Sequence, residues 1–209
     1  MDHESMPPFL LLFSPHRVAQ SLKNLANNRR VLRLKGTGFV QVFWKDVEVG
    51  DILRIENDGF FPADLLLLSS SEPDGLCYVE TANLDGSVPP PPTPCGLPRF
   101  MTCSLFSSET NLKLKQARKE TAQILTPGEA RELTGAIKCE LPNNSLYTFE
   151  GVLLHEDGRE IPLDPGQLLL RGCQLRNTPW CYGVVVFTGY DTKLFRNAKY
   201  ELTNSCALF

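Results

Sequence analysis

Short runs of alternating apolar and polar residues, set apart by turn-forming residues, recur along this chain and limit it to a small set of folds. Residues 31–35 and 39–44 alternate at a period of two, and Gly36-Thr37-Gly38 separates them. Asp157-Gly158 is a strong signal for a tight hairpin turn that pairs residues 151–155 with residues 159–163. Regularly spaced short strands of this kind are typical of β-sandwiches and rolls, so the sequence predicts a mainly β domain.

The same patterning predicts the remaining elements. We expect further strands at residues 47–55, 112–115, 137–141, 145–155, 167–176 and 180–188. Two short helices are also expected. One covers residues 15–28 and begins at Ser14-Pro15, which can cap and start a helix. The other runs from Thr126 to about Thr134, because Thr126 and Glu129 have the spacing of a capping box.

Composition excludes several classes of function. The formal charge of -3 comes from 21 Lys and Arg against 24 Asp and Glu, without the basic excess of a nucleic-acid-binding protein. The seven cysteines form no Cys-x-x-Cys pair and the three histidines are scattered, so we expect neither a disulfide framework nor a metal site. No apolar run reaches the roughly 18 to 20 residues of a membrane span. The sequence is therefore interpreted as a soluble chain in a reducing compartment.

The most distinctive motif is split in two. Its first half ends in Leu84-Asp85-Gly86, its second half begins with Glu109-Thr110-Asn111, and both halves adjoin strand-like residues. Between them, residues 87–108 are rich in proline and lack strand patterning. If residues 87–108 are removed, the ends join as Leu-Asp-Gly-Glu-Thr-Asn-Leu-Lys.

The joined string resembles the actuator-domain motif of the type IV P-type ATPases, the phospholipid-translocating lipid flippases. Further strings are similar to successive stretches of the same domain, in the same order: Pro62-Ala63-Asp64, Leu168-Leu169-Leu170-Arg171-Gly172-Cys173, Leu175-Arg176-Asn177-Thr178 and Thr188-Gly189-Tyr190-Asp191-Thr192-Lys193-Leu194. The resemblance implies a distorted jelly-roll actuator domain with one or two short flanking helices. We expect it to cover residues 29–197, interrupted at residues 87–108. An N-terminal segment of residues 1–28 precedes it and a tail of residues 198–209 follows.

The resemblance also implies a catalytic role for Asp85, Gly86, Glu109 and Thr110. In the family, an aspartyl phosphate formed from ATP is hydrolysed by a water molecule that a carboxylate orients, and Glu109 matches that carboxylate. Gly86 would let the backbone approach the phosphoryl group closely. The implied partners are the phosphorylated domain of a full-length ATPase and its accessory subunit, and phospholipid is reached only through the membrane domain of the parent enzyme.

The chain lacks other parts of such an enzyme. It has neither an Asp-Lys-Thr-Gly-Thr phosphorylation motif nor a Gly-rich nucleotide loop, so no ATP, Mg²⁺ or other cofactor is expected to bind here, although the parent family uses ATP and Mg²⁺. This polypeptide alone is not expected to hydrolyse ATP or move lipid. The parent family resides in membranes with this domain on the cytosolic face, and we expect the fragment itself to be cytosolic.

Residues 87–108 raise the questions of how they affect the domain and what their origin is. Lengthening the loop adds only about 1.5 to 2 kcal/mol to its closure free energy, a cost that the fold could survive. A misplacement of about 1 Å can cost on the order of a hundredfold in rate, so Glu109 is not expected to be delivered correctly. The proline-rich composition fits an intron read in frame, and its alternative is a loop that binds a proline-recognising module. The alternatives to an actuator-domain fragment are a non-catalytic regulator of a full-length flippase or its partner subunit, and an inactive splice product.

Overall fold

The computed structural model describes residues 27–81, 112–155 and 157–197. Within these ranges the chain is mainly β, with antiparallel strands and few short helices, which confirms the predicted class. Only Asn27 and Asn28 of the predicted helix at residues 15–28 are described. The predictions for residues 87–108 and 198–209 lie outside the described ranges.

Twelve strands form three sheets in the described part of the chain. A six-stranded sheet has the order β10-β4-β12-β3-β1-β2. Its members are β1 (Arg30–Lys35), β2 (Gly38–Phe43), β3 (Ile52–Glu56), β4 (Asp64–Ser70), β10 (Leu168–Leu169) and β12 (Trp180–Phe187). The second sheet, β11-β5-β6, contains β5 (Leu76–Glu80), β6 (Leu112–Gln116) and β11 (Gln174–Arg176). The third, β7-β8-β9, contains β7 (Gly135–Cys139), β8 (Gly151–His155) and β9 (Glu160–Leu163).

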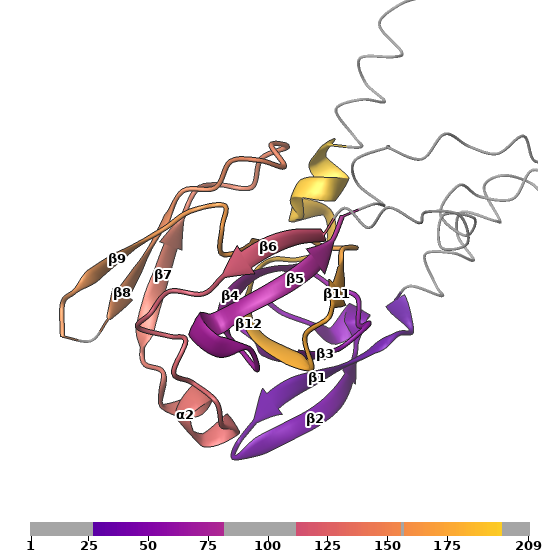
Figure 1. Ribbon diagram of the computed structural model, residues 1–209. Coiled ribbons are helices and arrows are strands. Elements are labelled where there is room, and N and C mark those ends of the chain that lie inside the picture. The colour runs from indigo at the N-terminus through magenta and orange to yellow at the C-terminus, as the bar shows by residue number, and fades with distance from the viewer. Residues whose placement is uncertain (1–26, 82–111, 156, 198–209) are drawn as a thin grey trace, which may run out of the picture.

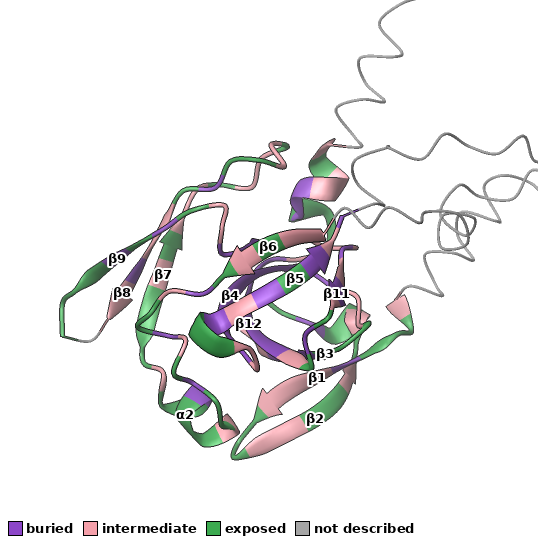
Figure 2. Ribbon diagram, in the orientation of Figure 1, coloured by how far each residue is buried: buried purple, intermediate pink, exposed green. Residues whose placement is uncertain are grey.

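The six-stranded sheet is covered on both faces (Figure 1). Leu65 and Leu67 of β4 belong to a core shared with Cys77 and Val79 of β5. Leu66 and Leu68, which point to the opposite face, belong to a second core shared with the β7-β8-β9 sheet. This double burial explains why β4 is an unbroken apolar run rather than an alternating one, and why β4 and β12 are coloured as buried in Figure 2.

The one α-helix bounded within the described residues is α2 (Pro127–Glu132), and it begins as predicted. The Thr126 hydroxyl accepts a hydrogen bond from the Glu129 N–H at 3.3 Å, and the Glu129 carboxylate accepts one from the Thr126 N–H at 3.0 Å. Three single turns of 3-10 helix, η1 (Trp44–Asp46), η2 (Pro73–Gly75) and η4 (Gly189–Asp191), complete the bounded elements. Residues 193–197 are also helical.

Three predicted strands differ from the structure by more than two residues at an end or in number. The strand predicted at residues 167–176 is two strands, β10 and β11, which belong to different sheets. The turn between them contains Gly172 at φ +84°, a conformation that interrupts an extended chain. The segments predicted at residues 47–55 and 145–155 become strands only at Ile52 and at Gly151.

Candidate functional site

The predicted catalytic residues Asp85, Gly86, Glu109 and Thr110 lie outside the described residues, but the strands on either side of them are described. Strand β5 pairs antiparallel with β6 from Leu76 opposite Gln116 to Glu80 opposite Leu112. The chain therefore leaves the sheet at Glu80 and returns to it at the directly neighbouring position. Both halves of the split motif belong to the single connection between two paired strands.

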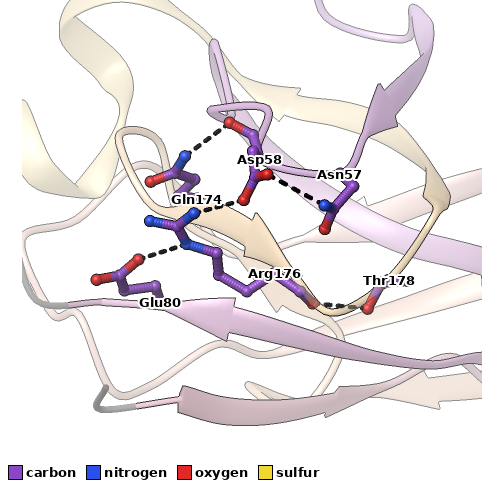
Figure 3. A network of polar contacts seen from close by, with 6 residues as sticks. All are labelled: Asn57, Asp58, Glu80, Gln174, Arg176 and Thr178. Atoms are coloured by element: carbon purple, nitrogen blue, oxygen red, sulfur yellow. Dashed lines mark hydrogen bonds and ion pairs between the residues drawn. The ribbon is translucent and has the colours of Figure 1, made fainter. Parts of the chain in front are cut away.

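A polar network centred on Arg176 holds the end of β5 where this connection starts (Figure 3). The Arg176 Nε donates a hydrogen bond to Glu80 Oε2 at 2.7 Å, and Nη1 donates to Asp58 Oδ1. Arg176 lies on β11, the other neighbour of β5, where it is opposite Tyr78. One guanidinium thus joins β5 and β11 to the turn that contains Asp58.

The two turns that support Arg176 are themselves hydrogen-bonded. Asp58 has a positive φ of 62°, its N–H donates to Leu175 O at 3.0 Å, and its carbonyl accepts from Gln174 Nε2 at 2.7 Å. Thr178 Oγ1 donates to Arg176 O at 2.9 Å and accepts from the Tyr78 N–H at 3.2 Å. These contacts give the β5 end of the connection a fixed geometry.

The charges of the network are complementary. The hydrogen bond to Glu80, together with the bond to Asp58, raises the pKa of the Arg176 guanidinium above its usual range. Arg176 is therefore a permanent cation between two carboxylates, suited to holding backbone segments in place and not to transferring protons.

A second polar centre, the Asp64 junction, is formed by Asp64, Arg171 and Lys193. Asp64 is fully buried at the start of β4. Its Oδ1 accepts from the Arg171 N–H at 2.8 Å and its Oδ2 from the Lys193 N–H at 2.7 Å. Burial raises the pKa of Asp64, while these two N–H donors and the nearby positive charges oppose that rise. Three of the motifs singled out in the sequence therefore meet at one carboxylate.

Lys193 extends the junction to the segment that follows β7. Its side chain is fully buried, and its amine donates to Glu140 Oε1 at 2.7 Å and to Asn143 Oδ1 at 2.6 Å. The buried ammonium is thus paired and hydrogen-bonded, which is the condition for a charge in a protein interior. Through Asp64 and Lys193, the segments that carry these three motifs are joined to the six-stranded sheet.

Three further observations concern metal binding, surface hollows and membrane-spanning helices. The described residues contain no group of three His, Cys, Asp or Glu side chains that could hold a metal ion. A surface hollow of about 490 Å³ borders Asp58, with Arg29, Arg54 and Trp44 among its lining residues. In the described part of the chain, no helix is both long and apolar enough to cross a membrane.

The sequence analysis named Arg176 and Asp64 only as members of motifs that resemble the family. It assigned no role to Asp58 or Glu80. The partners of Arg176 lie 96 and 118 positions away in the chain, so no local pattern could have paired them. The Asn57-Asp58-Gly59 turn was the one available signal, because Asp and Asn adopt positive φ more readily than other residues with side chains.

The known proteins described below that are similar to this chain in sequence are all phospholipid-transporting ATPases. A phospholipid-transporting ATPase of Schizosaccharomyces pombe is 48% identical over 204 residues, which cover 93% of this chain and 14% of the relative. Phospholipid-transporting ATPase DRS2 of Saccharomyces cerevisiae is 48% identical over 77% of this chain and 10% of its own length. Probable phospholipid-transporting ATPase 4 of Arabidopsis thaliana is 52% identical over 74% of this chain and 11% of its own length. The chain thus spans between 10% and 14% of these relatives.

No family model matches the chain. Among solved structures, a zinc-transporting PIB-type ATPase in the E2.Pi state aligns over 87% of this chain and 19% of its own, at 11% identity. The TM-score of 0.36 is too low for that alignment to add to the assignment.

Proposed function

We propose, since this chain belongs to the family of phospholipid-transporting ATPases, that it forms the actuator domain of such an enzyme and carries an insertion at residues 87–108. In this role the domain promotes hydrolysis of an aspartyl phosphate on another domain and couples that step to lipid transport. The observation that supports the proposal is the pairing of Glu80 with Leu112, which sets the described residues on either side of the split motif next to each other.

For the hydrolysis of the aspartyl phosphate, the main requirement on this domain is a correctly positioned carboxylate. Hydrolysis of an acyl phosphate requires a water molecule that is oriented and deprotonated as it attacks phosphorus. We assign this task to Glu109, with Asp85, Gly86 and Thr110 shaping the connection around the phosphoryl group. The network of Arg176, Asp58 and Glu80 supports this role because it fixes the base from which the connection starts.

The partners follow from the same role. The phosphorylated domain of a full-length pump would receive Glu109, and phospholipid would be handled by the membrane part of that pump. The parent enzyme would be an integral membrane protein with this domain on its cytosolic side. The isolated chain is proposed to be inactive, because residues 87–108 separate Gly86 from Glu109 and small misplacements of catalytic groups cost large factors in rate.

A chimeric pump tests the proposal. The homologous segment of DRS2 would be replaced by residues 29–197 of this chain, once with and once without residues 87–108, and dephosphorylation of the phosphorylated enzyme would be timed. We expect the shortened chimera to dephosphorylate and the complete one to be slower by about a hundredfold or more. The matched control is Glu109→Gln in the shortened chimera, which should accumulate phosphoenzyme.

The outcome that rejects the actuator role is equally specific. If the shortened chimera becomes phosphorylated and then dephosphorylates at the same rate with and without the Glu109→Gln substitution, the assignment of the split motif is wrong. If both chimeras are equally fast, the motif assignment stands but the proposed effect of residues 87–108 does not.

A further inference from the structure

Strand β6 has its lysines on the inner face of its sheet. Lys113 lies opposite Val79 and Lys115 opposite Cys77, and both partners are buried. Leu114, in contrast, lies opposite the exposed Tyr78 and is 55% exposed. Lysine is mostly exposed in folded proteins, so the inward amine of the partly buried Lys115 requires explanation.

The Lys115 side chain lines a small cavity of about 110 Å³. Its other walls are largely apolar and include Val79, Leu168 and Leu170. The Lys115 amine donates a hydrogen bond to the carbonyl oxygen of Pro165 at 2.7 Å. Because a water molecule occupies about 30 Å³ in the liquid, this cavity can hold a group of a few heavy atoms beside the amine.

The surroundings shift the protonation equilibrium of this amine toward the neutral form. Burial lowers the pKa of Lys115, and the like charge of Lys113 acts in the same direction. The negative charges that ionised Cys173, ionised Cys77 and Asp164 would carry oppose this effect. However, burial raises the pKa of Cys77 to about 12, and Asp164 is held by Arg118 at 3.0 Å. A neutral amine carries the free electron pair that nucleophilic attack requires.

We propose that Lys115 is an acylation site, at which the amine takes a small acyl group from an acyl thioester. The nitrogen electron pair forms a bond to the thioester carbonyl carbon, the carbon–sulfur bond breaks, and the thiolate leaves with its electron pair. The nitrogen then loses a proton to water, and the thiolate gains one. The products are an N-acyl lysine and a thiol. The amide N–H of the product still has Pro165 O as an acceptor, and the apolar cavity walls surround the acyl group.

The complete 209-residue chain would be incubated with S-acetyl-N-acetylcysteamine, a small acetyl thioester, and acetylation of each lysine would be followed by mass spectrometry. An ordinary lysine is only about 0.04% neutral at pH 7, and each unit by which its pKa is lowered raises that fraction about tenfold. We therefore expect Lys115 to be acetylated several-fold faster than Lys138, an exposed lysine on β7. Its rate should also level off at a lower pH.

Three controls make the result decisive. Lys115→Arg should remove the fast site, while Lys113→Arg, on the same face of β6, should retain it. In urea the advantage of Lys115 over Lys138 should vanish, because it depends on the folded cavity. The proposal is overturned if folded Lys115 is not acetylated, or if its rate has the same pH dependence as that of Lys138.

Discussion

Replacing Asp64 tests whether the junction of Asp64, Arg171 and Lys193 holds the domain together. Asp64→Ala would leave the N–H groups of Arg171 and Lys193 without the acceptors that now lie at 2.8 and 2.7 Å. An orphaned buried donor costs about 1 to 3 kcal/mol, so two of them predict a loss of about 4 kcal/mol in the free energy of unfolding. A loss of that size is a large part of the stability of an ordinary domain.

The variant Asp64→Asn separates the charge from the hydrogen bonds. Its amide keeps one acceptor oxygen but presents an NH₂ group to the second donor, while it removes a charge that burial disfavours. We expect a smaller loss of about 1 to 2 kcal/mol. Urea unfolding followed by tryptophan fluorescence measures both variants, with the midpoint and the slope compared to those of the unchanged chain. If Asp64→Asn is as stable as the unchanged chain and Asp64→Ala loses less than about 1 kcal/mol, the junction is not a stabilising element.

Two further substitutions give smaller, separate effects. Arg176→Met should lower the free energy of unfolding by about 1 kcal/mol in a urea titration, because two partly exposed ion pairs are worth about 0.2 to 1 kcal/mol each. High salt should reduce this difference in stability. A loss that does not depend on salt would show that packing, and not charge, is responsible. The N–H groups of Leu125 and Thr126 lower the pKa of Glu129, so its contribution to stability is present above its unfolded pKa and is lost as the pH falls through its folded pKa. Glu129→Gln should therefore be less stable than the unchanged chain at pH 7, and the difference should shrink as the pH falls through the folded pKa of Glu129; a difference that grows toward acid would contradict this mechanism.

Local signals allowed much of the fold to be predicted. The hairpin of β8 and β9 and the capping box of α2 depend on residues a few positions apart, and both form where the sequence placed them. The predicted single strand at residues 167–176 was wrong because the turn that contains Gly172, at φ +84°, divides the segment into strands of two different sheets. A run of leucines shows that a segment is buried but not how many sheets it enters.

Alternation reveals the period of a strand and leaves open which face is buried. In β6 the leucine face is the natural choice for the core, yet the structure turns the lysine face inward, because the register with β5 sets Lys115 opposite buried Cys77. The partners of Arg176 and Asp64 were also beyond sequence reasoning. Asp64 lies 107 positions from Arg171, and only the folded sheets bring them together.

The contacts that define the base of the β5–β6 connection involve only residues outside the proposed insertion at 87–108. Glu80 is held by Arg176, and Leu112 is held by its pairing with Glu80, so each end is fixed by residues outside 87–108. The Asp64 junction likewise draws on residues 64, 171 and 193 alone. Stability therefore depends on the two ends of the connection, whereas the proposed catalysis depends on the position of Glu109 within it. The proposed insertion at residues 87–108 would act on the second requirement, while the contacts of the first include none of its residues.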